Sequence, residues 1–116
     1  MGVLCTTPEW ASTLKDMDKD DPRRGPKLGG YRHRYFVPAD LAAWDTYVST
    51  VTAHYHDQIR VWDAWNEPYW PDFFIDHYDL QDKAARKGWC HPSDPAQAFA
   101  NLMTRAHQVI KTVDPS

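Results

Sequence analysis

Residues 59–68, Ile-Arg-Val-Trp-Asp-Ala-Trp-Asn-Glu-Pro, carry the pattern that decides the fold. β-Branched and aromatic residues dominate positions 59–65, which predicts a strand over that range. Pro68 then prevents continuation of the strand, because proline has no backbone N–H to donate to a neighbouring strand. An amide and a carboxylate, Asn66 and Glu67, therefore come directly after a predicted strand.

The residues before this strand predict a helix and another strand. Residues 38–56 open with Pro-Ala-Asp, a helix start signal, and apolar or aromatic side chains then recur every three or four positions, at Leu41, Trp44, Val48, Val51 and Tyr55. Further upstream, residues 1–7 contain the β-prone run Val-Leu-Cys-Thr-Thr, which Pro8 ends. A strand, a helix and a strand in this order form a βαβ unit, whose two strands are expected to lie parallel. Asn66 and Glu67 are therefore expected at the carboxyl end of the second strand, on the same side as residues 8–10.

Two long loops follow the two predicted strands. The first, residues 8–37, is interrupted by Asp-Pro, Gly-Pro and Gly-Gly pairs, and the second, residues 66–95, is rich in aromatic, histidine and aspartate residues. A second helix is predicted over residues 96–113, where one face collects Phe99, Leu102, Met103, Ala106, Val109, Ile110 and Val113. Long loops that come only after strands are typical of the active-site face of a (β/α) barrel.

Composition narrows the class of partner. The net charge of −3 with mixed signs offers no basic face for nucleic acid, and no apolar run reaches membrane-spanning length. Six tryptophans and six tyrosines in 116 residues favour a ligand cleft, because the polar edges of these rings suit half-wet sites. No signal peptide is expected before the first strand.

Neither the cysteines nor the histidines predict a cofactor. Cys5 and Cys90 are the only cysteines, and two free thiols are a more common arrangement than one disulfide. A set of histidines accompanies Cys90, but the spacing follows no zinc pattern and the residues are spread over a helix and a loop; the set is His54, His56, His77 and His91. We therefore expect no metal and no cofactor.

Residues 62–68, Trp-Asp-Ala-Trp-Asn-Glu-Pro, resemble the fourth-strand signature of clan A glycoside hydrolases. Residues 7–10 resemble the end of the third strand in these enzymes, residues 38–61 the helix that leads into the signature, and residues 114–116 the turn into the fifth strand. The resemblance implies an α/β fold, namely a partial (β/α)8 TIM barrel made of two consecutive βα units, strands 3 and 4 with their helices. The histidine that cellulase-like members carry after the third strand has no counterpart here, which favours relatives of family 39.

The resemblance also implies roles for individual residues. Glu67 would be the general acid/base of a retaining double displacement that hydrolyses O-glycosidic bonds in a polysaccharide or oligosaccharide, and Asn66 would contact the sugar. Substrate contacts are also expected from Trp70, Trp10 and Glu9. The apolar rings of Trp65 and Trp70 are expected to help Glu67 to keep its proton, and Asp63 is expected to be a buried, hydrogen-bonded carboxylate.

A retaining enzyme needs a second carboxylate about 5–5.5 Å from the first, as nucleophile. In clan A this residue comes from the seventh strand, and a whole barrel takes about 250 residues. The chain is therefore expected to supply the acid/base but not the nucleophile, and to need the missing barrel units in cis or from another chain. Two alternatives remain open: a non-catalytic carbohydrate-binding or accessory fragment, and an unrelated small α/β interaction domain.

Overall fold

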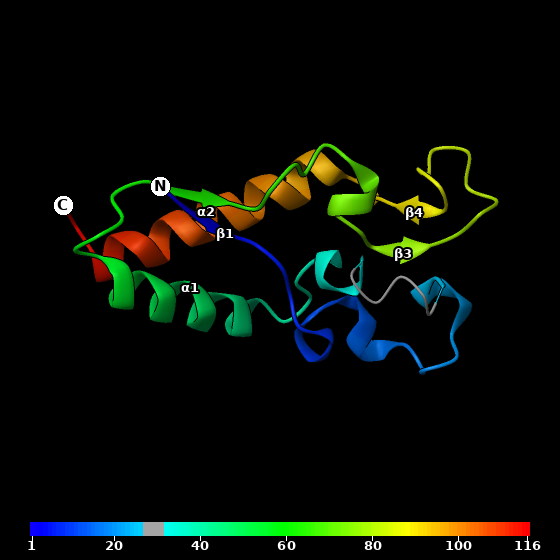
Figure 1. The fold of residues 1–116 in the computed structure, drawn as a ribbon, viewed down its shortest axis with the longest axis horizontal. Helices are drawn as coiled ribbons and strands as arrows, with labels where there is room; N and C mark the ends of the chain where they lie inside the picture. The colour runs from blue at the N-terminus through cyan, green and yellow to red at the C-terminus, as the bar shows by residue number, and fades with distance from the viewer. Residues whose placement is uncertain (27–31) are drawn as a thin grey trace.

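The computed structural model describes residues 1–26 and 32–116; the remainder of the predicted loop 8–37, which includes the Gly29-Gly30 pair, lies outside the described residues. Figure 1 shows a small mixed α/β domain. Its elements are β1 (Gly2–Leu4), α1 (Leu41–Tyr55), β2 (Trp62–Ala64), β3 (His77–Tyr78), β4 (Trp89–Cys90) and α2 (Pro95–Val113), with short 3₁₀ helices between them.

Strands β1 and β2 pair in parallel, as the βαβ order predicts. Gly2 lies opposite Trp62, and Leu4 lies opposite Ala64. The Trp65 backbone N–H donates to the Leu4 carbonyl at 2.7 Å, which extends the pairing by one bond beyond β2. Both strands are shorter than the predicted ranges 1–7 and 59–65, and the described residues form a two-stranded parallel sheet rather than a closed barrel.

The two helices cover only one face of this parallel sheet. Leu4 and Ala64 point into the core between the sheet and the helices and are buried. Their neighbours Val3 and Asp63 lie opposite each other on the other face, and both are exposed. The expectation that Asp63 is buried and hydrogen-bonded is therefore wrong, because the face that carries it has no covering layer among the described residues.

Both helices lie close to their predicted ranges, 38–56 and 96–113, and each has an aspartate at its N-cap. The Asp40 side chain accepts a hydrogen bond from the Ala43 N–H at 2.9 Å, and the Asp94 side chain does the same for the Gln97 N–H. The helices pack on each other and on the sheet, around a core of Leu4, Val37, Trp44, Val48, Ala64, Trp65, Phe74, Leu102 and Ala106. Leu41 and Tyr55, at the two ends of the predicted α1 stripe, remain exposed.

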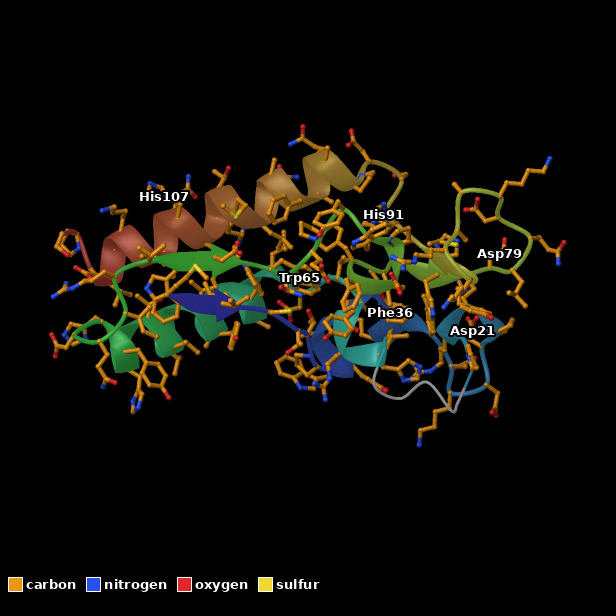
Figure 2. All side chains as sticks on the ribbon, turned by 45° about the horizontal axis from the view of Figure 1, so that its top comes forward. Asp21, Phe36, Trp65, Asp79, His91 and His107 are labelled. Atoms are coloured by element: carbon orange, nitrogen blue, oxygen red, sulfur yellow. The ribbon has the colours of Figure 1, made fainter. Side chains whose placement is uncertain are left out.

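The rest of the chain forms a second half with its own core. Leu14, Phe36, Ile75 and Trp89 are buried together there. Figure 1 shows β3 and β4 at the end of the molecule away from the carboxyl ends of α1 and α2, and Figure 2 shows Phe36 between these strands and the helices. The antiparallel pair β3–β4 lies within residues 66–95, which the sequence predicted as loop; strands of two residues are too short to leave a periodic pattern. Among the described residues, no helix has the length and apolarity needed to cross a membrane.

Candidate functional site

The parallel pairing brings the ends of β1 and β2 together, and with them the two segments that carry the predicted site. Residues 6–10 follow β1 and residues 65–70 follow β2, so both leave the sheet at its carboxyl edge. The Trp65 backbone N–H donates to the Leu4 carbonyl at 2.7 Å, so the two strands stay side by side up to the points where these segments begin. The expectation that Asn66 and Glu67 lie on the same side as residues 8–10 is confirmed.

The backbone is strained at this edge. Thr6, Trp65 and Glu67 have φ values of 77°, 91° and 50°, in the left-handed region that residues with a β-carbon rarely adopt. Lys87 is the only other such residue apart from glycine in the described part of the chain. A left-handed conformation costs about 1–3 kcal/mol per residue and is typical of functional sites, where the surrounding structure holds it in place.

Glu67 is half-buried, and its carboxylate is held by a neighbouring side chain. The Tyr69 hydroxyl donates a hydrogen bond to Glu67 Oε1 at 3.1 Å. The Glu67 carbonyl accepts from the Trp70 N–H at 3.1 Å, so the backbone after β2 forms a tight turn. Asn66 is exposed beside it. The sequence did not point to Tyr69 as a site residue, although its position two residues after Glu67 was a usable signal.

The Trp65 side chain turns away from this edge into the core. It is 1% exposed, and its ring lies 5.4 Å from the Phe74 ring and 6.2 Å from the Trp44 ring, between centroids. Its indole N–H donates to the Phe73 carbonyl. Trp65 is thus a core residue that anchors the segment after β2, which differs from its expected role as an apolar neighbour of the Glu67 carboxyl group.

Trp70 is partly exposed, and one of its faces is already occupied. The Arg86 guanidinium carbon lies 4.0 Å from the centroid of the Trp70 ring, which is a cation–π contact, and the Tyr69 ring lies 5.5 Å away. Trp70 is 41% exposed, so part of the ring remains accessible for the predicted contact with a sugar.

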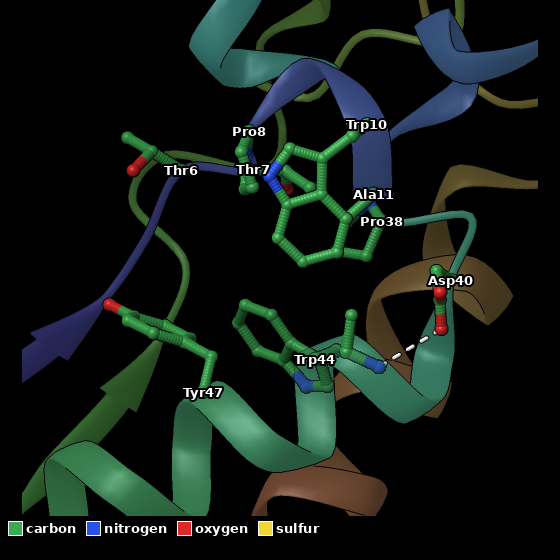
Figure 3. Close-up of a pocket in the computed structure, with 10 residues that line it drawn as sticks. Thr6, Thr7, Pro8, Trp10, Ala11, Pro38, Asp40, Trp44 and Tyr47 are labelled. Atoms are coloured by element: carbon green, nitrogen blue, oxygen red, sulfur yellow. Dashed lines mark hydrogen bonds between the residues drawn. The ribbon is translucent and has the colours of Figure 1, made fainter.

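Trp10 borders a pocket between the segment after β1 and the start of α1 (Figure 3). The pocket has a volume of about 220 Å³, and Trp10 lies across it from Trp44 and Tyr47. Trp10 is 67% exposed, which is high for so large a ring and leaves its face free to stack on a ligand. Burial raises the pKa of the Tyr47 phenol, which faces the Cys5 backbone.

Glu9, by contrast, has both carboxylate oxygens engaged. Arg24 Nη2 donates to Glu9 Oε2 at 2.6 Å, and His33 Nδ1 lies 3.2 Å from Glu9 Oε1. The hydrogen bond from Arg24 is the largest cause that holds the pKa of Glu9 below its usual value. These pairs tie the segment after β1 to residues 24 and 33, and a sugar hydroxyl would have to compete with them for Glu9.

The thiols are free, and one of them belongs to a group of potential metal ligands. Cys90 is buried, and its Sγ lies within 4.8 Å of a ring nitrogen of His77 and a carboxylate oxygen of Asp82. These three residues are not scattered, although the spacing of the histidines in the sequence suggested that they would be, because the pairing of β3 with β4 places His77 opposite Cys90. No sequence signal pointed to Asp82, whose carboxylate comes from the connecting loop.

Comparison with known proteins adds no relative: no family model, no curated protein and no solved structure matches this chain. A functional proposal for this chain therefore rests on the pattern of residues 62–68, on the fold and on the geometry of the side chains.

Proposed function

We propose that the chain forms two consecutive βα units of a (β/α)8 barrel of the retaining glycoside hydrolase type, and that Glu67 is its general acid/base. The observation that carries the proposal is the placement of Glu67, with Asn66, on a strained turn at the carboxyl end of a parallel strand whose opposite sheet face is open. Active sites of (β/α) barrels are built at that end of the strands.

The open sheet face supports the barrel part of the proposal. Parallel sheets normally have both faces covered, because their strands are apolar on both sides. Here the helices cover one face, and the other exposes Val3, 46% accessible, opposite Asp63. Each strand also has one edge without a partner strand in the described residues. Further βα units, in cis or from another chain, would pair with these edges and turn the open face into a barrel interior.

The surroundings of Glu67 suit an acid/base. A general acid must donate to a leaving-group oxygen in one step and accept a proton from water in the next, so its carboxyl group must be both oriented and reachable. The hydrogen bond from Tyr69 orients one oxygen, and the half-exposed side chain leaves the carboxyl group accessible. Asn66, exposed next to it, is available for a sugar hydroxyl.

The nucleophile must come from the missing units. Glu9 is the only other glutamate in the chain, and Arg24 and His33 hold both of its oxygens. A retaining mechanism needs a carboxylate about 5–5.5 Å from the acid/base to form the glycosyl-enzyme intermediate. The 116-residue chain by itself should therefore show no turnover of aryl glycosides.

The test uses the polypeptide or complex that includes the remaining barrel units, with Glu67 replaced by alanine. We expect a loss of about 10²- to 10⁴-fold on natural glycosides, and a smaller loss of the first step with a nitrophenyl leaving group, which needs less protonation. Azide attacks without a base, so it should partly restore turnover and give a glycosyl azide of retained configuration. Asp57→Ala is the control and should keep the activity, because this exposed carboxylate lies between α1 and β2, at the opposite end of β2 from Glu67.

Absence of azide rescue, or a product of inverted configuration, would show that Glu67 is not the acid/base of a double displacement.

A second candidate function is carbohydrate binding without catalysis, favoured by the exposed ring of Trp10 beside the pocket of Figure 3. In that case the 116-residue chain should bind oligosaccharides, Trp10→Ala should abolish binding, and Glu67→Gln should leave it unchanged.

A further inference from the structure

Strands β3 and β4 and the loop that connects them bring together three side chains that could each supply a different metal-ligand atom. His77 ends up opposite Cys90 because the two strands pair antiparallel in that register, so both side chains lie on the same face of the two-stranded ribbon. Tyr78 and Trp89 form the next pair along the ribbon, and their side chains lie on its other face. Their rings meet edge to face with centroids 4.8 Å apart, and they pack in the core of the second half of the molecule. The packing of Tyr78 and Trp89 therefore holds β3 and β4 together, and the pairing of these strands places His77 opposite Cys90.

Asp82 completes the group from the loop. Its Oδ1 accepts a hydrogen bond from the Ala84 N–H at 2.8 Å, which holds the carboxylate in place. One donor atom from each of His77, Asp82 and Cys90 lies within 4.8 Å of the other two. These residues contribute one nitrogen, one oxygen and one sulfur, a mixed set that magnesium and calcium do not favour and that zinc does.

Two features of the surroundings prepare this trio for a metal. Asp76 Oδ2 lies 2.9 Å from His77 Nδ1, and a carboxylate that accepts the Nδ1 hydrogen leaves the Nε2 lone pair free to bind a metal. The Cys90 thiol is buried, and its contacts to the Asp79 and Gly88 carbonyl oxygens are long, 3.9 Å and 3.6 Å. The Cys90 Sγ and a carboxylate oxygen of Asp82 lie within 4.8 Å of each other, so these two ligands already share one space.

We propose that His77, Asp82 and Cys90 form a mononuclear zinc site that clamps the loop 79–88 onto β3 and β4. Tetrahedral zinc with bond lengths of about 2.0–2.3 Å holds its ligand atoms about 3.3–3.7 Å apart, so the donors need to approach by about 1 Å. Zinc replaces the thiol proton of Cys90, which is released to the solvent, and water takes the fourth position because Asp82 is exposed. The site does not depend on the proposed glycosidase function.

The test is a titration of the reduced 116-residue chain with Co²⁺ alone, followed by Zn²⁺. Cobalt bound by a thiolate gives a near-ultraviolet charge-transfer band, and we expect one equivalent to produce this band and zinc to remove it. Cys90→Ser should abolish the band, and the matched control Cys5→Ser should keep it. His77→Gln should weaken binding, whereas His107→Gln, at an exposed position of α2, should not.

Two further variants guard against misfolding of the Cys90 variant. Asp82→Asn changes an exposed side chain, so its circular dichroism should match that of the unchanged chain while its cobalt affinity falls. Asp76→Asn removes the partner of His77 and should weaken affinity about 10- to 100-fold. The absence of a thiolate band in the unchanged chain, a band that is lost in Cys5→Ser instead of Cys90→Ser, or unchanged affinity in both aspartate variants would overturn the proposal.

Discussion

Replacement of Trp65 by alanine tests whether this residue is the main anchor of the segment that carries Glu67. The Trp65 ring is buried between the Trp44 and Phe74 rings, and deletion of a buried tryptophan side chain costs about 3–5 kcal/mol. The substitution also leaves the Phe73 carbonyl without the indole donor, which costs about 1–3 kcal/mol if the group stays buried. The two contributions overlap, and we expect a total loss of about 4–6 kcal/mol.

That loss is a large part of the total stability. A 116-residue chain is expected to have a free energy of unfolding of about 6–17 kcal/mol, from about 0.05–0.15 kcal/mol per residue. In urea, with a slope of about 1.5–2 kcal/mol per molar, the midpoint should fall by about 2–4 M. Unfolding should be followed by far-ultraviolet circular dichroism, because the substitution itself alters the tryptophan fluorescence.

Two further variants make the result specific. Trp65→Phe keeps an aromatic ring in the core but loses the hydrogen bond to Phe73, so it should cost about 1–3 kcal/mol. Trp10→Ala removes an exposed ring and should change the stability by no more than about 0.5 kcal/mol. If Trp65→Ala costs no more than Trp10→Ala, then the Trp65 side chain does not occupy the core and its assignment as the anchor is wrong.

Two other substitutions test local features of the second half and of the segment after β1. Gly88→Ala should lower the free energy of unfolding by about 2–3 kcal/mol, since Gly88 has a φ of +87° and an added Cβ would lie 2.5 Å from the Tyr78 ring; a urea midpoint equal to that of the unchanged chain would contradict this. Glu9→Gln should lower stability by about 0.5 kcal/mol or less near neutral pH, because the Glu9–Arg24 pair is solvent-screened. The pKa of Glu9 is lowered in the folded state, so its contribution is present above the ordinary pKa of 4.5 and is lost as the pH falls through the folded pKa. The urea midpoints of the Glu9→Gln variant and of the unchanged chain should therefore converge in acid. A difference between these midpoints that grows in acid would refute the Glu9–Arg24 ion pair.

Elements with a regular pattern could be predicted from the amino-acid sequence alone. Apolar residues at helical spacing, with the Pro-Ala-Asp start signal that contains Asp40, predicted α1 and α2 to within a few residues of their observed ends. The strand–helix–strand order predicted a parallel pair, and this in turn predicted that Asn66 and Glu67 share one edge of the sheet with residues 8–10. Such conclusions depend on local periodicity and chain order, which a single sequence contains.

Which side chains face which neighbours depends instead on the tertiary structure. The left-handed backbone at Trp65 ends the strand alternation, so parity along β2 does not predict the core position of Trp65. Asp63 is exposed for a different reason, because its face of the sheet has no covering layer among the described residues. Glu9 meets Arg24 and His33, 15 and 24 residues away, only after the intervening segment has folded back.

The strands and the ligand group in the second half of the molecule could also not be predicted from the sequence alone. Strands β3 and β4 have two residues each, too few for a period of two to be recognised, and they form because Tyr78 and Trp89 pack into the core around Phe36. That packing brings together His77, Asp82 and Cys90, whose spacing matches no known ligand pattern. A ligand group that long-range packing assembles cannot be recognised from the spacing of its residues in the sequence. The distances between the ligands depend on the core that they pack against and not on the length of chain between them.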